Sequence, residues 1–154
     1  MTTLHTLDIE TRFALRDLVD RYARAIDSRL SPELEALFDA DAVILLPELI
    51  ARRTGNRELR DFATIVPNLT SMFEATRHLM FQQTLTVVDG KVHGEVYSEA
   101  HHLYRTPAGP RDAVMHSRYL DVYVEQEGSW RFSQREQVLD WIDDRSLSES
   151  SPVV

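Results

Sequence analysis

The spacing of apolar residues predicts helices in the N-terminal part of the chain. Between Asp8 and Asp27 the apolar residues recur every three or four positions, and charged residues fill the places between them. This spacing is typical of an amphipathic helix with one side turned to the core. Ser31 followed by Pro32 predicts the start of a second, short helix over residues 31–38, because serine caps helix N-termini and proline fits the first turn.

The next segment predicts a strand and further helical turns. Residues 41–46 are an apolar run with β-branched members, and Pro47 ends it, which favours a strand. Asn56 can cap a third helix that reaches residue 65, and Pro67 should break this helix. One or two more helical turns are expected over residues 68–75.

The second half of the chain has the pattern of a sheet. Short connections that contain glycine or proline join the extended runs, so we expect an antiparallel meander. Helices followed by strands favour an α+β domain, expected to span residues 1–145 of the 154, with a serine-rich disordered tail over residues 146–154. The predicted strands are residues 77–88, 91–106, 113–125 and 129–141.

Alternation along the strands predicts which side chains face the core. In the second predicted strand the even positions are mostly small or apolar and the odd ones polar, so His102 should point inward and His101 outward. In the third strand the apolar end of the even set predicts that His116 and Arg118 also point inward, although a β-bulge would reverse this.

Composition excludes several classes of function. A net charge of −8 argues against a nucleic-acid partner, and the absence of cysteine excludes disulfides and thiolate sites. No apolar run approaches the length of a membrane span and no targeting segment is recognised, so no membrane contact and a cytoplasmic location are expected. Both faces of the strand over residues 77–88 carry apolar residues, which favours a partner subunit and hence a homo-oligomer, a dimer or trimer.

Inward histidines make Asp27 a candidate partner. A carboxylate bonded to one imidazole nitrogen fixes the tautomer and raises the basicity of the other, which creates a general acid or base. The alternative is that Asp27 is an exposed residue at a helix end, and a lone inward histidine is more often a hydrogen-bonded structural residue than a catalyst. The acidic run over residues 140–144 lacks the spacing of a metal site, so no metal is predicted.

Several short marks in this order resemble the SnoaL-like branch of the nuclear-transport-factor-2-like superfamily. The resemblance implies a cone, in which a curved antiparallel sheet packed on N-terminal helices encloses a deep pocket. Enzymes of the superfamily include scytalone dehydratase, bile-acid dehydratase, a dehydrochlorinase, ketosteroid isomerase and polyketide cyclases, and most need no cofactor. The marks are residues 18–27, 37–42, 76–78, 100–102, 117–121, 128–131 and 139–141.

The resemblance also implies particular site residues. In dehydratase-like members an aspartate at the end of the first helix pairs with a histidine at the start of a strand, and these positions match Asp27 and His78. Tyr22 matches a pocket residue, and His102 matches a second histidine. An arginine on the following strand of the dehydrochlorinase falls near His116 or Arg118.

These expectations combine into one hypothesis, a cofactor-independent lyase or isomerase acting on a hydrophobic cyclic molecule. His78, oriented by Asp27, would remove a proton, and His102 or Tyr22 would donate one. Arg118 or His116 would hold developing negative charge. Alternatives are a non-catalytic binding or assembly module of the same fold and a polyketide-cyclase-like aldol catalyst. Further residues expected to contact the substrate are Met80, Ser98 and Tyr104.

Overall fold

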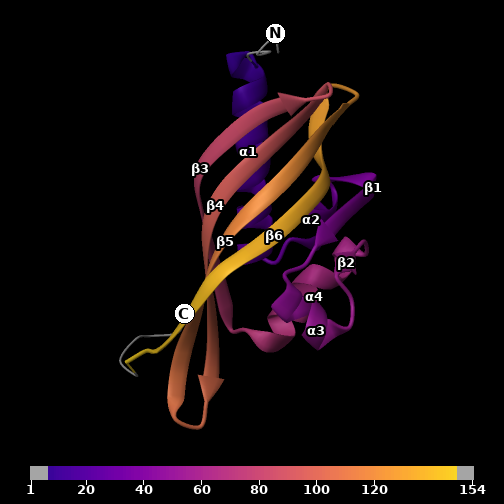
Figure 1. Cartoon of the computed structure of the whole chain (residues 1–154). Helices are drawn as coiled ribbons and strands as arrows, with labels where there is room; N and C mark the ends of the chain where they lie inside the picture. The colour runs from indigo at the N-terminus through magenta and orange to yellow at the C-terminus, as the bar shows by residue number, and fades with distance from the viewer. Residues whose placement is uncertain (1–6, 149–154) are drawn as a thin grey trace.

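The computed structural model describes residues 7–148. Helices and short strands occupy the first half, and four long strands occupy the second half (Figure 1). The helical elements are α1 (Ile9–Asp27), α2 (Ser31–Glu35), α3 (Glu48–Thr54), the 3₁₀ turn η1 (Phe62–Thr64) and α4 (Ile65–Met72). The strands are β1 (Phe38–Leu45), β2 (Glu58–Leu59), β3 (Ala75–Val88), β4 (Lys91–Thr106), β5 (Gly109–Gln126) and β6 (Ser129–Ser146).

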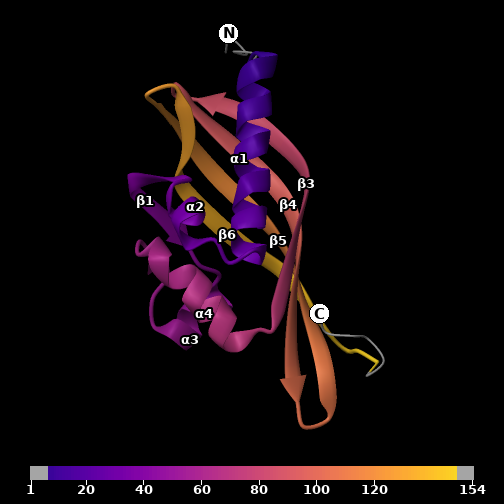
Figure 2. The same cartoon turned by 180° about the vertical axis from the view of Figure 1, so that it is seen from behind.

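The strands form one curved sheet that is not closed, in the order β2-β1-β6-β5-β4-β3. The predicted α+β fold and the antiparallel meander of β3 to β6 are confirmed. One pairing differs from the fully antiparallel sheet that was expected, because β1 runs parallel to β6. Helix α1 lies across one face of the sheet, and the hairpin of β4 and β5 extends beyond the helices (Figure 2).

The core lies between α1 and the face of the sheet that α1 covers, called the inner face below. Helix α1 starts at Asp8, whose carboxylate accepts a hydrogen bond from the Thr11 backbone N–H at 2.7 Å. Its apolar side packs on the sheet and buries residues at three- and four-residue spacing, among them Leu15, Leu18, Val19, Tyr22 and Ile26. The core residues include Leu15, Leu18, Val19, Ile26, Val92, Val96 and Phe132.

A fully buried ion pair stands inside this core. Asp121 on β5 and Arg135 on β6 have no exposed side-chain surface, and two hydrogen bonds of 2.8 Å join them. The guanidinium of Arg135 lies 4.2 Å from the ring centres of Tyr22, Tyr119 and Phe132. The aromatic faces and Asp121 together compensate the buried positive charge.

The predictions for the region before β3 are partly wrong. No helix spans residues 56–65, which contain β2 and η1, and helix α3 was not predicted. Pro67 does not break a helix but lies in the first turn of α4. A backbone N–H at that place has no partner within the helix, so proline costs little there.

The C-terminal strand continues beyond the predicted domain boundary. Ser146 still belongs to β6, and the backbone N–H of Leu147 donates to Pro110 at 3.0 Å. The first residues of the predicted tail are therefore part of the sheet. Its remainder, residues 149–154, lies outside the described residues.

Helix α1 holds the edge strand β3 at two places. Arg16 donates to the backbone carbonyl groups of Met80 and Phe81, where the β3–β4 register shifts between Met80 and Gln83. The second place is the C-terminal end of α1, where Asp27 contacts the beginning of β3. This second contact builds the candidate site.

Candidate active site

Asp27 and His78 form the pair that the sequence predicted. Oδ1 of Asp27 lies 2.7 Å from Nδ1 of His78, and Oδ2 accepts the His78 backbone N–H at 2.7 Å. The two side chains are largely buried, with 23% of Asp27 and 6% of His78 exposed. Since an ionised carboxylate only accepts hydrogen bonds, Nδ1 carries a proton, and in the neutral form of the ring the lone pair is on Nε2.

Thr76 and Arg29, which were not predicted as site residues, complete this arrangement. Thr76 Oγ1 donates to Asp27 Oδ1 at 3.0 Å, and Arg29 donates to Thr76 Oγ1 at 2.8 Å. Thr76 precedes His78 by two positions, so both side chains lie on the same face of β3. That shared face is the signal that would have identified Thr76, whereas nothing in the sequence indicates where the Arg29 side chain lies.

These contacts keep Asp27 ionised. Burial alone would raise the pKa of the Asp27 carboxyl, but hydrogen bonds from His78 and Thr76 outweigh burial and hold this pKa below its usual value. An ionised Asp27 can stabilise an imidazolium on His78 without taking its proton.

His102 faces inward as predicted, next to His78. The rings of His78 and His102 meet edge to face with centroids 5.8 Å apart, and the Phe73 ring packs against His102 with centroids 4.7 Å apart. Burial and the neighbouring His78 lower the pKa of His102 to about 4. Its Nδ1 lies 3.2 Å from the carbonyl oxygen of Ala113, which can only accept, so His102 is neutral and its Nε2 is an acceptor.

Tyr22 lies in the core rather than beside the pair. It is 6% exposed, and its ring contacts Phe38, Tyr119 and Phe132 edge to face. Burial raises the pKa of the Tyr22 hydroxyl. Within residues 7–148 no hydrogen bond connects Tyr22 to Asp27 or His78, so the structure offers no support for its predicted role as a proton donor.

The inward orientation predicted for His116 and Arg118 is wrong. Residues opposite each other in an antiparallel pair share a face, and β4 places Glu99 opposite His116 and Tyr97 opposite Arg118. These partners lie on the outer face, away from α1. Alternation misleads on this strand because the charged Asp121 is buried on the inner face in its ion pair, while Leu120 and Val122 of the even set face outward.

The outer face holds His116, Arg118 and His101 in polar contacts. Arg118 forms an ion pair with Asp140 at 2.9 Å, and His116 stacks on Trp141 with centroids 4.7 Å apart. His101, predicted to point outward, lies there and contacts Asp112 at 2.7 Å. The partner subunit expected to cover this face stays a prediction.

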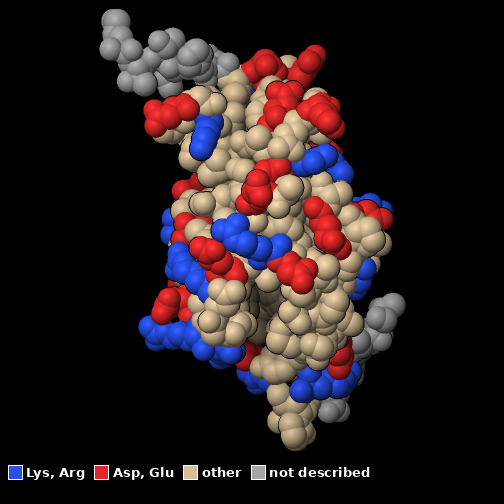
Figure 3. Space-filling model, turned by 90° about the vertical axis from the view of Figure 1, so that its right-hand side faces the viewer, with Lys and Arg blue, Asp and Glu red and all other residues tan. Residues whose placement is uncertain are grey.

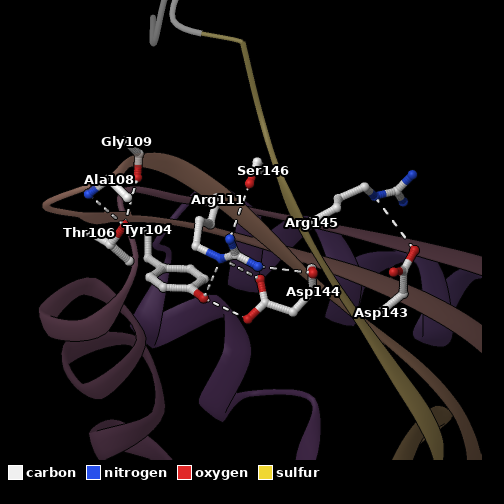
Figure 4. A network of polar contacts seen from close by, with 9 residues as sticks. All are labelled: Tyr104, Thr106, Ala108, Gly109, Arg111, Asp143, Asp144, Arg145 and Ser146. Carbon is white, nitrogen blue, oxygen red and sulfur yellow. Dashed lines mark hydrogen bonds and ion pairs between the residues drawn. The ribbon is translucent and has the colours of Figure 1, made fainter.

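The three further contact residues differ in their surroundings. Ser98 is buried and donates to the Ser117 carbonyl at 3.2 Å, and Met80 packs against the core. The Tyr104 hydroxyl donates to Asp144 at 2.6 Å and accepts from Arg111, on the hairpin that extends beyond the helices (Figure 4). The Tyr104 hydroxyl is thus engaged in a network with Arg111 and Asp144.

Two hollows in the described part of the chain are lined by neither His78 nor Asp27. One, of about 490 Å³, is on the outer face, where Leu120 and Val122 are among its lining residues. The other, of about 280 Å³, lies between α3 and β6. An enclosed pocket over the pair therefore stays a prediction.

The described residues show no group of three or more His, Cys, Asp or Glu that could hold a metal ion.

Acidic side chains are interspersed with basic ones on the face shown in Figure 3, so that face carries no field of a single sign. No helix in the described range is long and apolar enough to cross a membrane.

A family model for the SnoaL-like domain matches residues 8–136. The chain belongs to this family. The match to the family model confirms the predicted resemblance. The sequence matches no curated protein.

Several solved structures share the fold of this chain. A candidate scytalone dehydratase from Novosphingobium aromaticivorans is 22% identical, with a TM-score of 0.74 over 94% of this chain and 93% of that chain. The type 3 hexachlorocyclohexane dehydrochlorinase from Novosphingobium barchaimii is 18% identical, with a TM-score of 0.75 over 94% and 96% of the two chains. The Kfla4162 protein from Kribbella flavida is 19% identical, with a TM-score of 0.75 over 88% and 95%. At these identities the likeness concerns the fold.

Proposed function

We propose that this SnoaL-like protein is a cofactor-independent lyase in which His78 is the general base. The observation that carries the proposal is the Asp27–His78 contact, because it fixes the tautomer that leaves Nε2 free to take a proton. Within residues 7–148 the His78 ring has a hydrogen-bond partner at Nδ1 but none at Nε2, and Nε2 is not a buried atom left without a partner. The lone pair on Nε2 of His78 is therefore accessible to a ligand.

The protonation state of His102 decides which residue can act as the acid. A neutral His102 with a free Nε2 accepts a hydrogen bond and is a poor acid near neutral pH, because its pKa is lowered to about 4. Tyr22 is buried in the core and, within residues 7–148, forms no hydrogen bond with Asp27 or His78. The imidazolium that forms on His78 is then the acid at hand, so one residue removes the proton and returns it to the leaving group.

These protonation states favour a particular substrate class. The substrate presents an acidic C–H to His78 and a hydroxyl or N–H donor to His102, since Nε2 of His102 can only accept. Phe73 next to His102 supplies an apolar surface for a ring. A hydroxylated, hydrophobic cyclic compound that loses water fits these requirements.

The structural relatives support an elimination. Among them are a candidate dehydratase and a dehydrochlorinase, whose names denote the loss of water and of hydrogen chloride. Both reactions begin by removing a proton next to a leaving group, which is the step that a tautomer-fixed imidazole performs.

The test is a turnover screen with matched variants. The protein is incubated with cyclic β-hydroxy ketones and chlorinated cyclohexanes, and mass spectrometry follows the loss of water or chloride. His78→Gln should reduce turnover by about 10²- to 10⁴-fold, whereas the outer-face control His116→Gln should leave it unchanged. Undiminished turnover by His78→Gln would refute the proposal. Equal binding without turnover by the wild-type protein and His78→Gln would favour a binding module instead.

A further inference from the structure

Arg29 occupies a backbone position at the end of α1 that favours glycine. Its φ is 59°, in the left-handed region, where a Cβ atom is strained. The Arg29 N–H bonds to Ile26 at 3.1 Å and the Leu30 N–H bonds to Ala25 at 2.8 Å. These are the two bonds of a Schellman motif, whose left-handed residue is usually glycine. The contacts of the side chain give a reason for an arginine at this position.

That side chain reaches the candidate site through Thr76. Nη1 of Arg29 donates to the Ile26 carbonyl at 2.9 Å and to Thr76 Oγ1 at 2.8 Å. A guanidinium only donates, so Thr76 receives this bond on a lone pair and its own proton is directed to Asp27, 3.0 Å away. Thr76 is 8% exposed, so few competing water molecules reach its hydroxyl.

We propose that Arg29 and Thr76 are positioning residues that hold Asp27 ionised and oriented toward His78. This inference rests on the proposed function of the pair. The Thr76 hydroxyl binds the same oxygen that contacts His78 Nδ1, while the other oxygen is held by the His78 backbone N–H. The carboxylate plane is thus fixed at both oxygens. The positive charge of Arg29, one hydroxyl away, adds to the preference for the ionised form.

Arg29→Gly is a suitable variant because glycine fits the backbone and removes only the side chain. The control is Glu127→Gly in the exposed β5–β6 turn, where φ is 52° and no catalytic role is assigned. Both variants relieve backbone strain, and thermal unfolding checks that each of them is folded at the temperature of the titration. A difference between the two variants in the titration midpoint of Asp27 then reports the loss of the Arg29 side chain.

The readout is carbon-13 NMR of the Asp27 carboxyl as pH is lowered, with its signal identified by its loss in Asp27→Asn. We expect Arg29→Gly to raise the titration midpoint of Asp27 by about half a pH unit or more, and Glu127→Gly to leave it unchanged. Thr76→Val should raise the midpoint as well, while Arg29→Lys and Thr76→Ser should restore part of the wild-type behaviour.

Wild-type midpoints in both Arg29→Gly and Thr76→Val would overturn the inference. Because these measurements use no substrate, they are independent of the turnover screen. A shifted Asp27 midpoint with no turnover on any compound would uphold the positioning contacts and count against the proposed lyase activity.

Discussion

Asp27→Asn replaces an acceptor-only carboxylate by an amide, and the surrounding donors decide how the amide must lie. The oxygen that faces the His78 backbone N–H cannot be exchanged for an NH₂ group without placing two donors together. The NH₂ group therefore takes the other position, opposite Nδ1 of His78 and near the Thr76 hydroxyl, which can rotate. Nδ1 must then accept, and the ring proton moves to Nε2.

The consequence is a folded protein with the wrong tautomer. An Nε2 that carries a proton cannot act as a base, and the equivalent change in a serine protease lowers kcat by about 10⁴-fold. The loss of charge-assisted hydrogen bonds should lower the free energy of unfolding by about 2 kcal/mol, because such bonds contribute about 1.5–3 kcal/mol each and the amide keeps some of them. Asp27→Asn should therefore lose activity far beyond its loss of stability.

Nitrogen-15 NMR of labelled histidine distinguishes the two tautomers directly. In the wild-type protein we expect the His78 proton on Nδ1, and in Asp27→Asn on Nε2, with His102 unchanged as an internal control. Urea unfolding measures the stability of both proteins. A His78 ring that keeps its proton on Nδ1 in Asp27→Asn would show that the carboxylate does not set the tautomer.

The remaining predictions concern stability. His102 is buried and neutral in the folded protein, with its pKa lowered to about 4, so below pH 6.5 the unfolded state binds more protons than the folded state. Lowering the pH from 7 to 5 should therefore reduce the free energy of unfolding of the wild-type protein by about 2 kcal/mol. His102→Gln should not show this loss. Gly94→Ala should destabilise by about 1–3 kcal/mol, because its Cβ would lie 2.6 Å from the Tyr123 hydroxyl oxygen. Arg135→Met should cost about 3–5 kcal/mol by leaving Asp121 buried and unpaired.

Urea unfolding curves check all three stability predictions, with the pH varied for His102. Equal acid sensitivity of the wild-type protein and His102→Gln would contradict the neutral, buried state of that ring. Wild-type stability of Gly94→Ala would show that Tyr123 moves aside at little cost. A small effect of Arg135→Met would mean that Asp121 is relieved by a proton or water.

The extent to which the site could be predicted differs from residue to residue. His102 followed correctly from alternation because its strand has one small or apolar set and one polar set. His116 and Arg118 did not, because the buried ion pair of Asp121 with Arg135 makes a charged position the inner one. A prediction from alternation takes charged residues to face outward, and a buried ion pair is an exception to this rule.

The sequence by itself determined the first helix, the four long strands and the α+β class. Periodicity is a local property, so the helix ending at Asp27 and the four long strands could be predicted from spacing alone. Resemblance to the family then supplied the pairing of Asp27 with His78. Only the tertiary structure decided that Thr76 and Arg29 complete this pair and that Tyr22 lies in the core. These contacts join residues far apart in the chain, and hydrogen-bond partners follow from where the backbone places each atom, which no local pattern records.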